Sequence, residues 1–188
     1  GLSKTSLHMD HNILIKTLKS EGNLKHSFSA NEIELIAQQM SVETFDKDSI
    51  LMHKGEPADC MAFLVNGRVQ ILEDERQIAL LTSGDCFGES MFSDEATRLA
   101  DVQAMEQTTV GLFTTHDFDT FLKTHQRLAL QFREIFKAVG QARAEQHAAE
   151  TYIDKRKYLA LIAHNNMKES LMEFCSIHTD KLEEFPLI

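Results

Sequence analysis

The sequence lacks the features that identify exported and membrane-inserted proteins. It has no signal-peptide pattern and no apolar run long enough to span a bilayer. Its 3 cysteines are unevenly spread and form no Cys-x-x-Cys pair. This distribution favours a reducing compartment over a disulfide-bonded environment, so a cytoplasmic protein without a membrane partner is expected.

Positive charge is also scarce. Lys and Arg number 19 against 29 Asp and Glu, which gives a net charge of −10. Without a basic stripe, such a chain is poorly suited to binding a nucleic-acid phosphate backbone, and no nucleic-acid partner is expected.

Tryptophan is absent, but 12 Phe and 8 Met residues indicate a filled apolar core. His8 and His11 stand one helical turn apart without further ligands, so no metal site is expected.

Short apolar runs between Val42 and Phe113 are the main structural signal in the sequence. They are rich in β-branched or aromatic residues, are separated by turn residues, and cover 49–52, 61–65, 69–72, 78–81 and 109–113. This regular interruption indicates an antiparallel β-barrel or jelly roll. Gly55 and Gly67 are expected at turns, and Asn66-Gly67 predicts a hairpin.

Helical patterns stand on both sides of the strand region. Ser29 to Glu32 forms a capping box ahead of an amphipathic helix. Beyond the strands, residues 118–152 contain no proline and only one glycine, Gly140, and their apolar residues follow helical spacing at Leu128, Phe132, Ile135, Val139 and Ala142. The spacing predicts a homodimer through the 125–150 helix. The alternative is a helix that lies on its own strand domain.

The most informative stretch runs from Gly84 to Val102 and reads GDCFGESMFSDEATRLADV. Gly88 lets the backbone approach a ligand closely, and the residues that follow are expected to open a short helix whose N–H groups favour an anion. Arg98 is placed to pair with the same anion through its planar fork, which leaves Glu89 to accept hydrogen bonds from sugar hydroxyls. The combination suits a compact phosphorylated sugar.

This stretch resembles the phosphate-binding cassette of cyclic nucleotide-binding domains, such as those of catabolite activator proteins and protein kinase A regulatory subunits. The matching residues are Phe87-Gly88-Glu89, Arg98, Ala100 and Val102. The resemblance implies an α+β fold, an antiparallel β-barrel or jelly roll flanked by helices, with a long C-terminal helix. The pattern of the last segment adds an incomplete α/β tail to this fold. The resemblance also implies a ligand-binding set of Phe87, Gly88, Glu89, Ser90, Arg98, Leu99 and Ala100.

Within that set, the resemblance implies a role for each kind of group. Glu89 would bind the ribose 2′-OH, Arg98 the cyclic phosphate, and the backbone amides of Gly88, Glu89 and Leu99 the remaining phosphate oxygens. Guanine-selective members of the family use a hydroxyl where this chain has Leu99. The implied ligand is therefore cAMP, with cGMP less favoured.

The last segment resembles the opening of methylglyoxal synthase. The apolar run Leu159–Ala163 predicts a buried parallel strand, and the family's first strand ends in Ala-His-Asp followed by Lys. The matching residues are Ala163, His164, Asn165 and Lys168, with Asn165 in place of the family's Asp. The resemblance implies only partial or vestigial catalytic positions at His164 and Lys168. Because the family's later residues are absent, this chain is not expected to be an enzyme, and the activity of a longer protein stays open.

Four segments are therefore expected. They are an N-terminal helical segment over 1–40, a cyclic nucleotide-binding barrel over 41–117, a lid or dimerisation helix over 118–152, and a truncated methylglyoxal synthase-like domain over 153–188. The expected function is a regulatory module that binds cAMP and transmits occupancy through the helix to the appended domain. The alternatives are a vestigial domain that only dimerises and the regulatory part of a methylglyoxal synthase.

Overall fold

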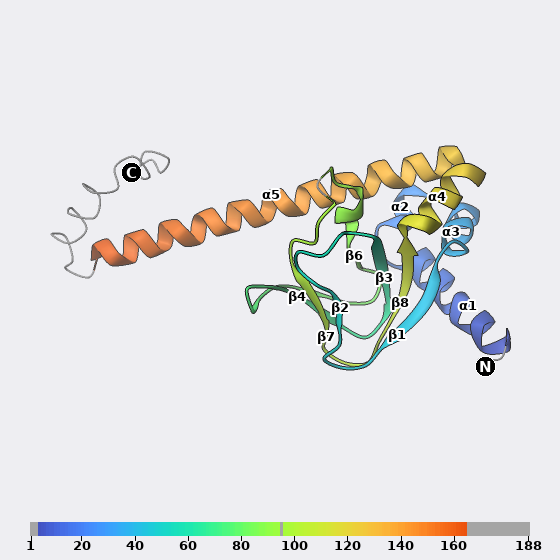
Figure 1. Ribbon diagram of the computed structural model, residues 1–188, viewed down its shortest axis with the longest axis horizontal. Helices are drawn as coiled ribbons and strands as arrows, with labels where there is room; N and C mark the ends of the chain where they lie inside the picture. Colours follow the sequence, from blue (N-terminus) through green and yellow to red (C-terminus); the bar gives the residue numbers. More distant parts are fainter. Residues whose placement is uncertain (1–3, 95, 165–188) are drawn as a thin grey trace. The chain divides into compact units, whose positions relative to one another are not determined.

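The computed structural model describes residues 4–94 and 96–164 (Figure 1). The chain divides into two compact units, residues 1–140 and residues 141–188. In chain order the elements are α1 (Lys4–Ser20), α2 (Leu24–Ser27), α3 (Ala30–Ala37), β1 (Ser41–Phe45), β2 (Ile50–Met52), β3 (Cys60–Asn66), β4 (Val69–Glu73), β5 (Arg76–Leu81), β6 (Cys86–Phe87), the 3-10 helix η1 (Glu89–Phe92), β7 (Asp101–Ala104), β8 (Thr108–Thr114), α4 (Thr115–Thr124) and α5 (Gln126–His164).

The strands form two four-stranded antiparallel sheets, in the orders β1-β8-β3-β6 and β2-β7-β4-β5. Side chains of β3 alternate between two apolar clusters, because successive residues of a strand point to opposite faces. Ala62 and Leu64 join side chains of the second sheet, and Met61, Phe63 and Val65 join those of the helices. The predicted jelly roll is therefore confirmed as a two-sheet sandwich, and β3 is apolar from Cys60 to Val65 because both of its faces are covered.

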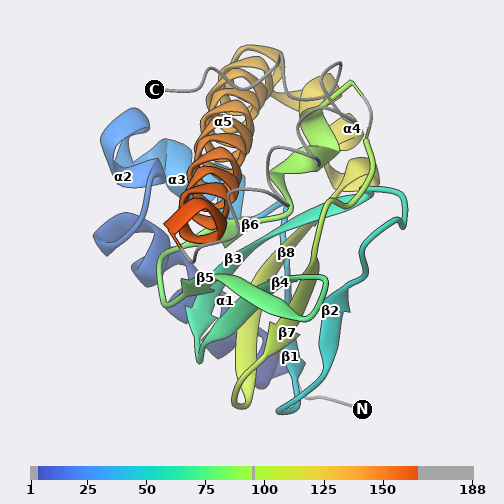
Figure 2. The ribbon, with the colours of Figure 1, turned by 90° about the vertical axis from the view of Figure 1, so that its left-hand side faces the viewer.

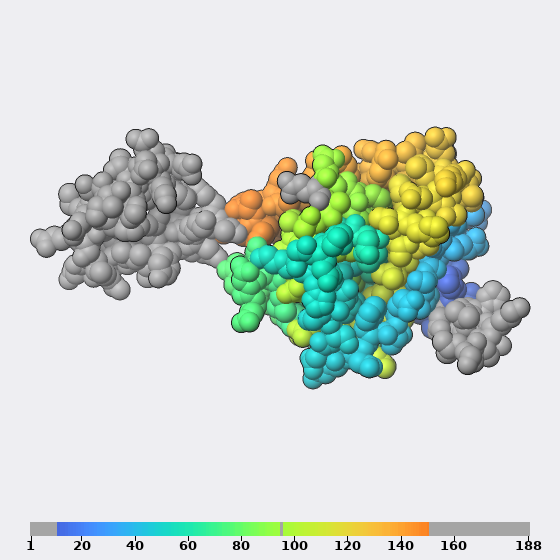
Figure 3. Space-filling model, in the orientation of Figure 1, coloured from blue at the N-terminus to red at the C-terminus, as the bar shows by residue number. Residues whose placement is uncertain are grey.

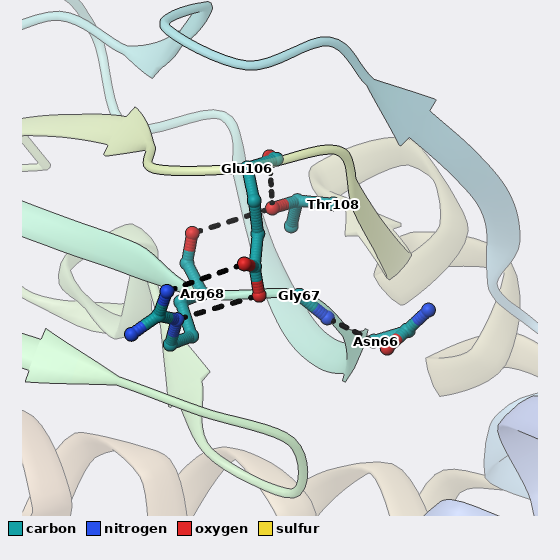
Figure 4. A network of polar contacts seen from close by, with 5 residues as sticks. All are labelled: Asn66, Gly67, Arg68, Glu106 and Thr108. Atoms are coloured by element: carbon teal, nitrogen blue, oxygen red, sulfur yellow. Dashed lines mark hydrogen bonds and ion pairs between the residues drawn. The ribbon is translucent and has the colours of Figure 1, made fainter.

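The turn between β3 and β4 differs from the prediction. Asn66-Gly67 was expected to close a hairpin, but β3 and β4 belong to different sheets. Gly67 has a φ of +94°, and a Cβ added there would lie 2.6 Å from Thr108 Oγ1. That hydroxyl donates to the carbonyl oxygens of Glu106 and Arg68 at 2.9 and 3.3 Å, while the Arg68 and Glu106 side chains form an ion pair at 3.3 Å (Figure 4). The turn is thereby tied to the β7–β8 connection.

A tight hairpin joins β4 to β5 instead. Glu73 pairs with Arg76, and the two residues between them, Asp74 and Glu75, have φ values of 48° and 65°. Positive φ at both central positions matches the right-handed twist of paired strands. Such turns favour Asn and Gly, so two acidic residues gave no signal for this hairpin in the sequence.

The capping box at the start of α3 is confirmed. Ser29 Oγ accepts from the Glu32 amide at 3.2 Å, and Glu32 Oε1 accepts from the Ser29 amide at 3.0 Å.

The predicted long helix is in fact two helices, because the chain leaves helical geometry at His125, where φ is −140°. No helix among residues 4–94 and 96–164 has the length and apolarity needed to cross a membrane.

The beginning of α5 lies between α2 and α3 on one side and η1 on the other (Figure 2). Leu128 and Phe132 are buried in the core of the first unit, and Ile135 and Val139 are half-buried against the same core. Ala142 is exposed. The first part of the predicted dimer seam therefore lies on its own domain, as in the alternative interpretation, and the homodimer stays a prediction.

The predicted strand at Leu159–Ala163 is wrong, because α5 continues through these residues to His164. A short apolar run fits a strand or a buried helix equally well by periodicity alone. Leu and Ala are strong helix formers, and no Pro or Gly separates the run from the preceding helix. Residues 165–188, including Asn165 and Lys168 and the remainder of the predicted α/β tail, lie outside the described residues.

Candidate functional site

The cassette begins at a point fixed by main-chain pairing to β3. The Gly84 amide donates to the Leu64 carbonyl at 2.9 Å, and Phe87 pairs with Ala62. The Phe87 side chain is buried in the apolar cluster that joins the two sheets. Phe87 was predicted as a ligand-binding residue, but its side chain serves the core and fixes where Gly88 stands.

Gly88 is required by both conformation and space. Its φ is +84°, which L side chains rarely adopt, and an added Cβ would lie 2.7 Å from Met52 Cε and 2.8 Å from the Cys60 carbonyl oxygen. The same Cβ would lie 3.0 Å from Arg98 Nη1. The missing side chain therefore lets the cassette, β2 and β3 meet around the arginine.

Arg98 is buried, with 5% of its side chain exposed. Its Nη1 donates to the Gly88 carbonyl at 3.1 Å, and its Nη2 donates to the carbonyl oxygen and the Sγ of Cys60 at 2.5 and 3.2 Å. Asp59 Oδ1 lies 3.6 Å from Nη2, but that carboxylate is 78% exposed. The site thus contains a buried cation that is held largely by neutral acceptors, which suits an incoming anion.

The Cys60 thiol is neutral at physiological pH. Burial is the main cause that raises its pKa to about 11, and the Asp59 carboxylate raises it further. The Arg98 cation acts in the opposite direction, because it favours the thiolate. Since burial dominates, the sulfur contacts Arg98 as a protonated thiol.

The main chain around Arg98 is bonded to the segment ahead of β3. The Arg98 amide donates to the Glu56 carbonyl at 2.9 Å, and the Gly55 amide donates to the Arg98 carbonyl at 2.9 Å. The next residue, Leu99, is 64% exposed, and Ala100 is half-buried. The two neighbours predicted for the site are therefore placed at its surface while Arg98 turns inward.

The long helix approaches the cassette at Glu89. A Cβ added to Gly140 would lie 3.2 Å from Glu89 Cγ, and the Glu89 Oε2 atom is buried. The Phe92 ring, at the end of η1, lies 5.1 Å from the Phe118 ring and 6.1 Å from the Phe132 ring. On the surface, the yellow residues of α4 and early α5 adjoin the green residues of the cassette (Figure 3).

The structure brings Gly88, Glu89 and Arg98 together as the sequence predicted, and it adds Asp59 and Cys60. Cys60 is the first residue of β3 and Asp59 directly precedes it, so both lie far from the cassette in sequence, and neither belongs to a motif. The main-chain bonds between residues 55–58 and 96–98, together with the pairing of β3 and β6, bring them to Arg98. Ser90 lies in η1, where its carbonyl accepts from the Ser93 hydroxyl at 2.8 Å.

His164 and Lys168 are the vestigial or partial catalytic candidates of the sequence. His164 is the last residue of α5 and belongs to the second unit, and Lys168 lies outside the described residues. In the part of the chain whose placement is described, no three His, Cys, Asp or Glu side chains are arranged to hold a metal ion. His11 instead contacts the Met40 carbonyl oxygen through Nε2 at 3.0 Å.

Two antiparallel sheets, flanking helices and a cassette with a left-handed glycine, a short helix and a buried arginine define the fold of the cyclic nucleotide-binding domains. The family model described as "cyclic nucleotide-binding domain" matches residues 42–125. Residues 42–125 are therefore similar to the domains of that family. The resemblance inferred from the cassette is confirmed at this level.

Solved structures share the fold at low sequence identity. A cyclic nucleotide-binding domain from Methylobacillus flagellatus has a TM-score of 0.61 at 18% identity, over 78% of this chain and 83% of that chain. The regulatory domain of Toxoplasma gondii PKA, crystallised with cAMP, has a TM-score of 0.60 at 19% identity, over 75% of this chain and 53% of that chain.

Curated relatives are much longer proteins. Glutaminase 1 of Bradyrhizobium diazoefficiens is 34% identical over 109 residues, which make up 57% of this chain and 18% of that protein. The chain spans less than a fifth of the length of the first curated relatives that it matches.

Proposed function

We propose that this chain is a regulatory module that binds a cyclic nucleotide, with cAMP preferred over cGMP, and that α5 transmits occupancy to the rest of a longer protein. The observation that carries the proposal is the buried guanidinium of Arg98 beside Gly88 in a domain similar to those of this family. A buried cation that is bonded mainly to neutral acceptors is a costly arrangement, which an anionic ligand would relieve.

The ligand is proposed to bind through three kinds of contact. Arg98 pairs with the cyclic phosphate, because charge-assisted hydrogen bonds from a guanidinium to phosphate are strong and directional. The amides of Gly88, Glu89 and Leu99 donate to the remaining phosphate oxygens, and Glu89 accepts from the ribose 2′-OH. The preference for cAMP is supported by Leu99, which offers no hydroxyl to a guanine.

Transmission through α5 is supported by its contacts with the cassette. Gly140 lies against Glu89, and Phe132 lies against Phe92. A ligand that moves Glu89 or η1 would therefore favour one packing of the helix over another. Gly140 lowers local helix stability by about 1 kcal/mol relative to alanine, which reduces the cost of bending there.

A role within a longer protein is supported by the relative named Glutaminase 1, since the aligned residues are only 18% of its length. We propose that the module reports to a downstream domain. The methylglyoxal synthase-like character of that domain stays a prediction from the sequence at Ala163, His164 and Lys168, with Asn165 in place of the family's Asp.

One observation favours a second candidate, a vestigial domain that only dimerises. The Arg98 side chain already bonds to Gly88 and Cys60 within the protein, so a ligand has to compete with these acceptors. The two candidates differ in whether nucleotide binds at all.

The deciding experiment is calorimetric titration of the chain with cAMP and, in the same buffer, cGMP. Arg98→Ala is expected to weaken cAMP binding by at least about 30-fold, because it removes charge-assisted hydrogen bonds to the phosphate. Arg68→Ala is the matched control, since Arg68 is an exposed arginine of the same domain whose ion pair is with Glu106. Its affinity should stay within about 2-fold of the wild-type value.

Thermal melting of each variant separates loss of binding from loss of folding. Equal affinities for wild-type and a folded Arg98→Ala protein would contradict the assignment of Arg98 to the phosphate. Heat from neither nucleotide would favour the vestigial domain.

A further inference from the structure

The thiol of Cys60 contacts the guanidinium of Arg98 and has no role in the proposed ligand contacts. We propose that Cys60 is a positioning residue, whose side chain orients Arg98 and thereby sets the affinity of the site for a cyclic phosphate. The inference rests on the proposed function and adds a residue that determines how well the site works.

Among the described residues, three acceptors form hydrogen bonds of 3.2 Å or less with the guanidinium, and Cys60 Sγ is the one that a side chain supplies. The Asp59 carboxylate lies farther away, at 3.6 Å from Nη2. The carbonyl oxygens of Gly88 and Cys60 are main-chain groups, which any residue at these positions would supply. Cys60 Sγ, at 3.2 Å from Nη2, is the acceptor that depends on which residue occupies position 60. A substitution at Cys60 therefore tests this contact while leaving both carbonyl contacts in place.

The main chain of Cys60 is held in place by strand pairing. Cys60 is the first residue of β3, where it pairs with Thr114 of β8 in the middle of a sheet. The other terminal nitrogen of the guanidinium, Nη1, donates to the Gly88 carbonyl, and a Cβ at Gly88 would lie 3.0 Å from it. Arg98 is thus held between a strand and the cassette, and groups held by rigid elements are oriented more closely than groups on loops.

The charge of the thiol explains why it can orient Arg98 without blocking an anion. Burial keeps Cys60 protonated, with a pKa of about 11, so it does not neutralise the guanidinium at pH 7. Asp59 does carry a negative charge, but it is 78% exposed and lies 3.6 Å from Nη2, where water screens it. Cys60 therefore restricts the geometry of Arg98 and leaves its positive charge available to the phosphate.

The test compares two substitutions at position 60 by calorimetric titration with cAMP. Cys60→Ala removes Sγ and should weaken binding by about 5-fold to 10-fold, as expected for the loss of one hydrogen bond whose acceptor is a weakly accepting thiol sulfur. Cys60→Ser restores an acceptor on a side chain of similar shape and should bind within about 2-fold of wild type. Thermal melts verify that each variant is folded. An alanine variant that binds as tightly as wild type would overturn the inference.

A second measurement needs no nucleotide. In the ligand-free protein, the ¹H–¹⁵N side-chain signals of Arg98 are assigned by their loss in Arg98→Lys. These signals should shift and broaden in Cys60→Ala and return toward the wild-type position in Cys60→Ser. Unchanged Arg98 signals in the alanine variant would show that the thiol does not position the guanidinium.

The two readouts distinguish failure of the inference from failure of the proposed function. If wild type binds neither cAMP nor cGMP, the proposed function fails, and the claim that Cys60 sets affinity fails with it. The Arg98 spectra then still decide whether Cys60 positions the guanidinium. If wild type binds cAMP and Cys60→Ala changes neither affinity nor spectrum, only the role of Cys60 is wrong.

Discussion

Gly88 and Gly55 show how one backbone conformation can serve two different purposes. Their φ values are +84° and +85°, so both positions disfavour any other residue. Around Gly55, among the described residues, no heavy atom lies within 4 Å of an added Cβ. At Gly88 the same Cβ would meet Met52 at 2.7 Å and the Cys60 carbonyl at 2.8 Å. Gly55 therefore serves a turn, and Gly88 serves the packing around Arg98.

Alanine substitutions separate these two effects. Gly55→Ala should lower the free energy of unfolding by about 1 kcal/mol through strain at positive φ alone. Gly88→Ala should lower it by about 2–4 kcal/mol, because strain is joined by overlap with a neighbouring main chain that cannot easily move. Urea denaturation of both variants measures the difference. Equal losses would contradict the close contact described at Gly88.

At the scale of elements, α5 approaches the cassette closely at Gly140, a residue that has no side chain. Gly140 lies over Glu89, and an added Cβ would lie 3.2 Å from Glu89 Cγ. Ala138, two residues earlier, is exposed. Because residues two apart on a helix point in different directions, the two positions test the same helix on its covered and its open side.

Leucine substitutions should therefore have different effects at these two positions. Gly140→Leu should lower the free energy of unfolding by about 1–3 kcal/mol, because overpacking against Glu89 outweighs the gain in helix propensity. Ala138→Leu should change it by no more than about 0.5 kcal/mol. Chemical denaturation measures both. A Gly140→Leu protein as stable as wild type would mean that the start of α5 is not held against the cassette.

At the scale of the whole molecule, the predicted seam of α5 has two parts with different surroundings. Phe132 is fully buried in the core of the first unit, where its ring lies 5.2 Å from that of Phe113 and 4.6 Å from that of Phe136. Ala142 is exposed. A homodimer through the 125–150 helix would therefore have to use residues beyond those that the core has already covered.

Two variants test whether the buried and the exposed parts of this seam have different roles. Phe132→Ala should lower the free energy of unfolding by about 3–5 kcal/mol at any protein concentration, as expected for a truncated core aromatic. Ala142→Glu should leave the domain's stability within about 0.5 kcal/mol of wild type and weaken self-association, because it places charge in the predicted seam. Denaturation and sedimentation velocity measure the two effects. An undiminished dimer in Ala142→Glu would exclude this face as the interface.

Strands β2, β3, β4, β5 and β8 could be predicted because their sequences contain runs dense in apolar residues. Strands β1, β6 and β7 could not, since Cys86–Phe87 has two residues and Ser41–Phe45 and Asp101–Ala104 each contain only two apolar residues. The segment Leu159–Ala163 is helical although its pattern predicted a strand. Its five apolar residues are compatible with strand or helix, and the preceding helix decided between them.

The sequence by itself determined the local chemistry of the cassette. Gly88, Glu89 and Arg98 lie within eleven residues of one another, so their spacing and residue types were enough to predict an anion site. The tertiary structure alone decided which groups surround Arg98 and which helix covers Glu89. Cys60 reaches Arg98 through the pairing of β3 with β6 and the main-chain bonds between residues 55–58 and 96–98. Gly140 reaches Glu89 through packing of α5 on the core. Such contacts depend on strand register and helix packing, which no local pattern records.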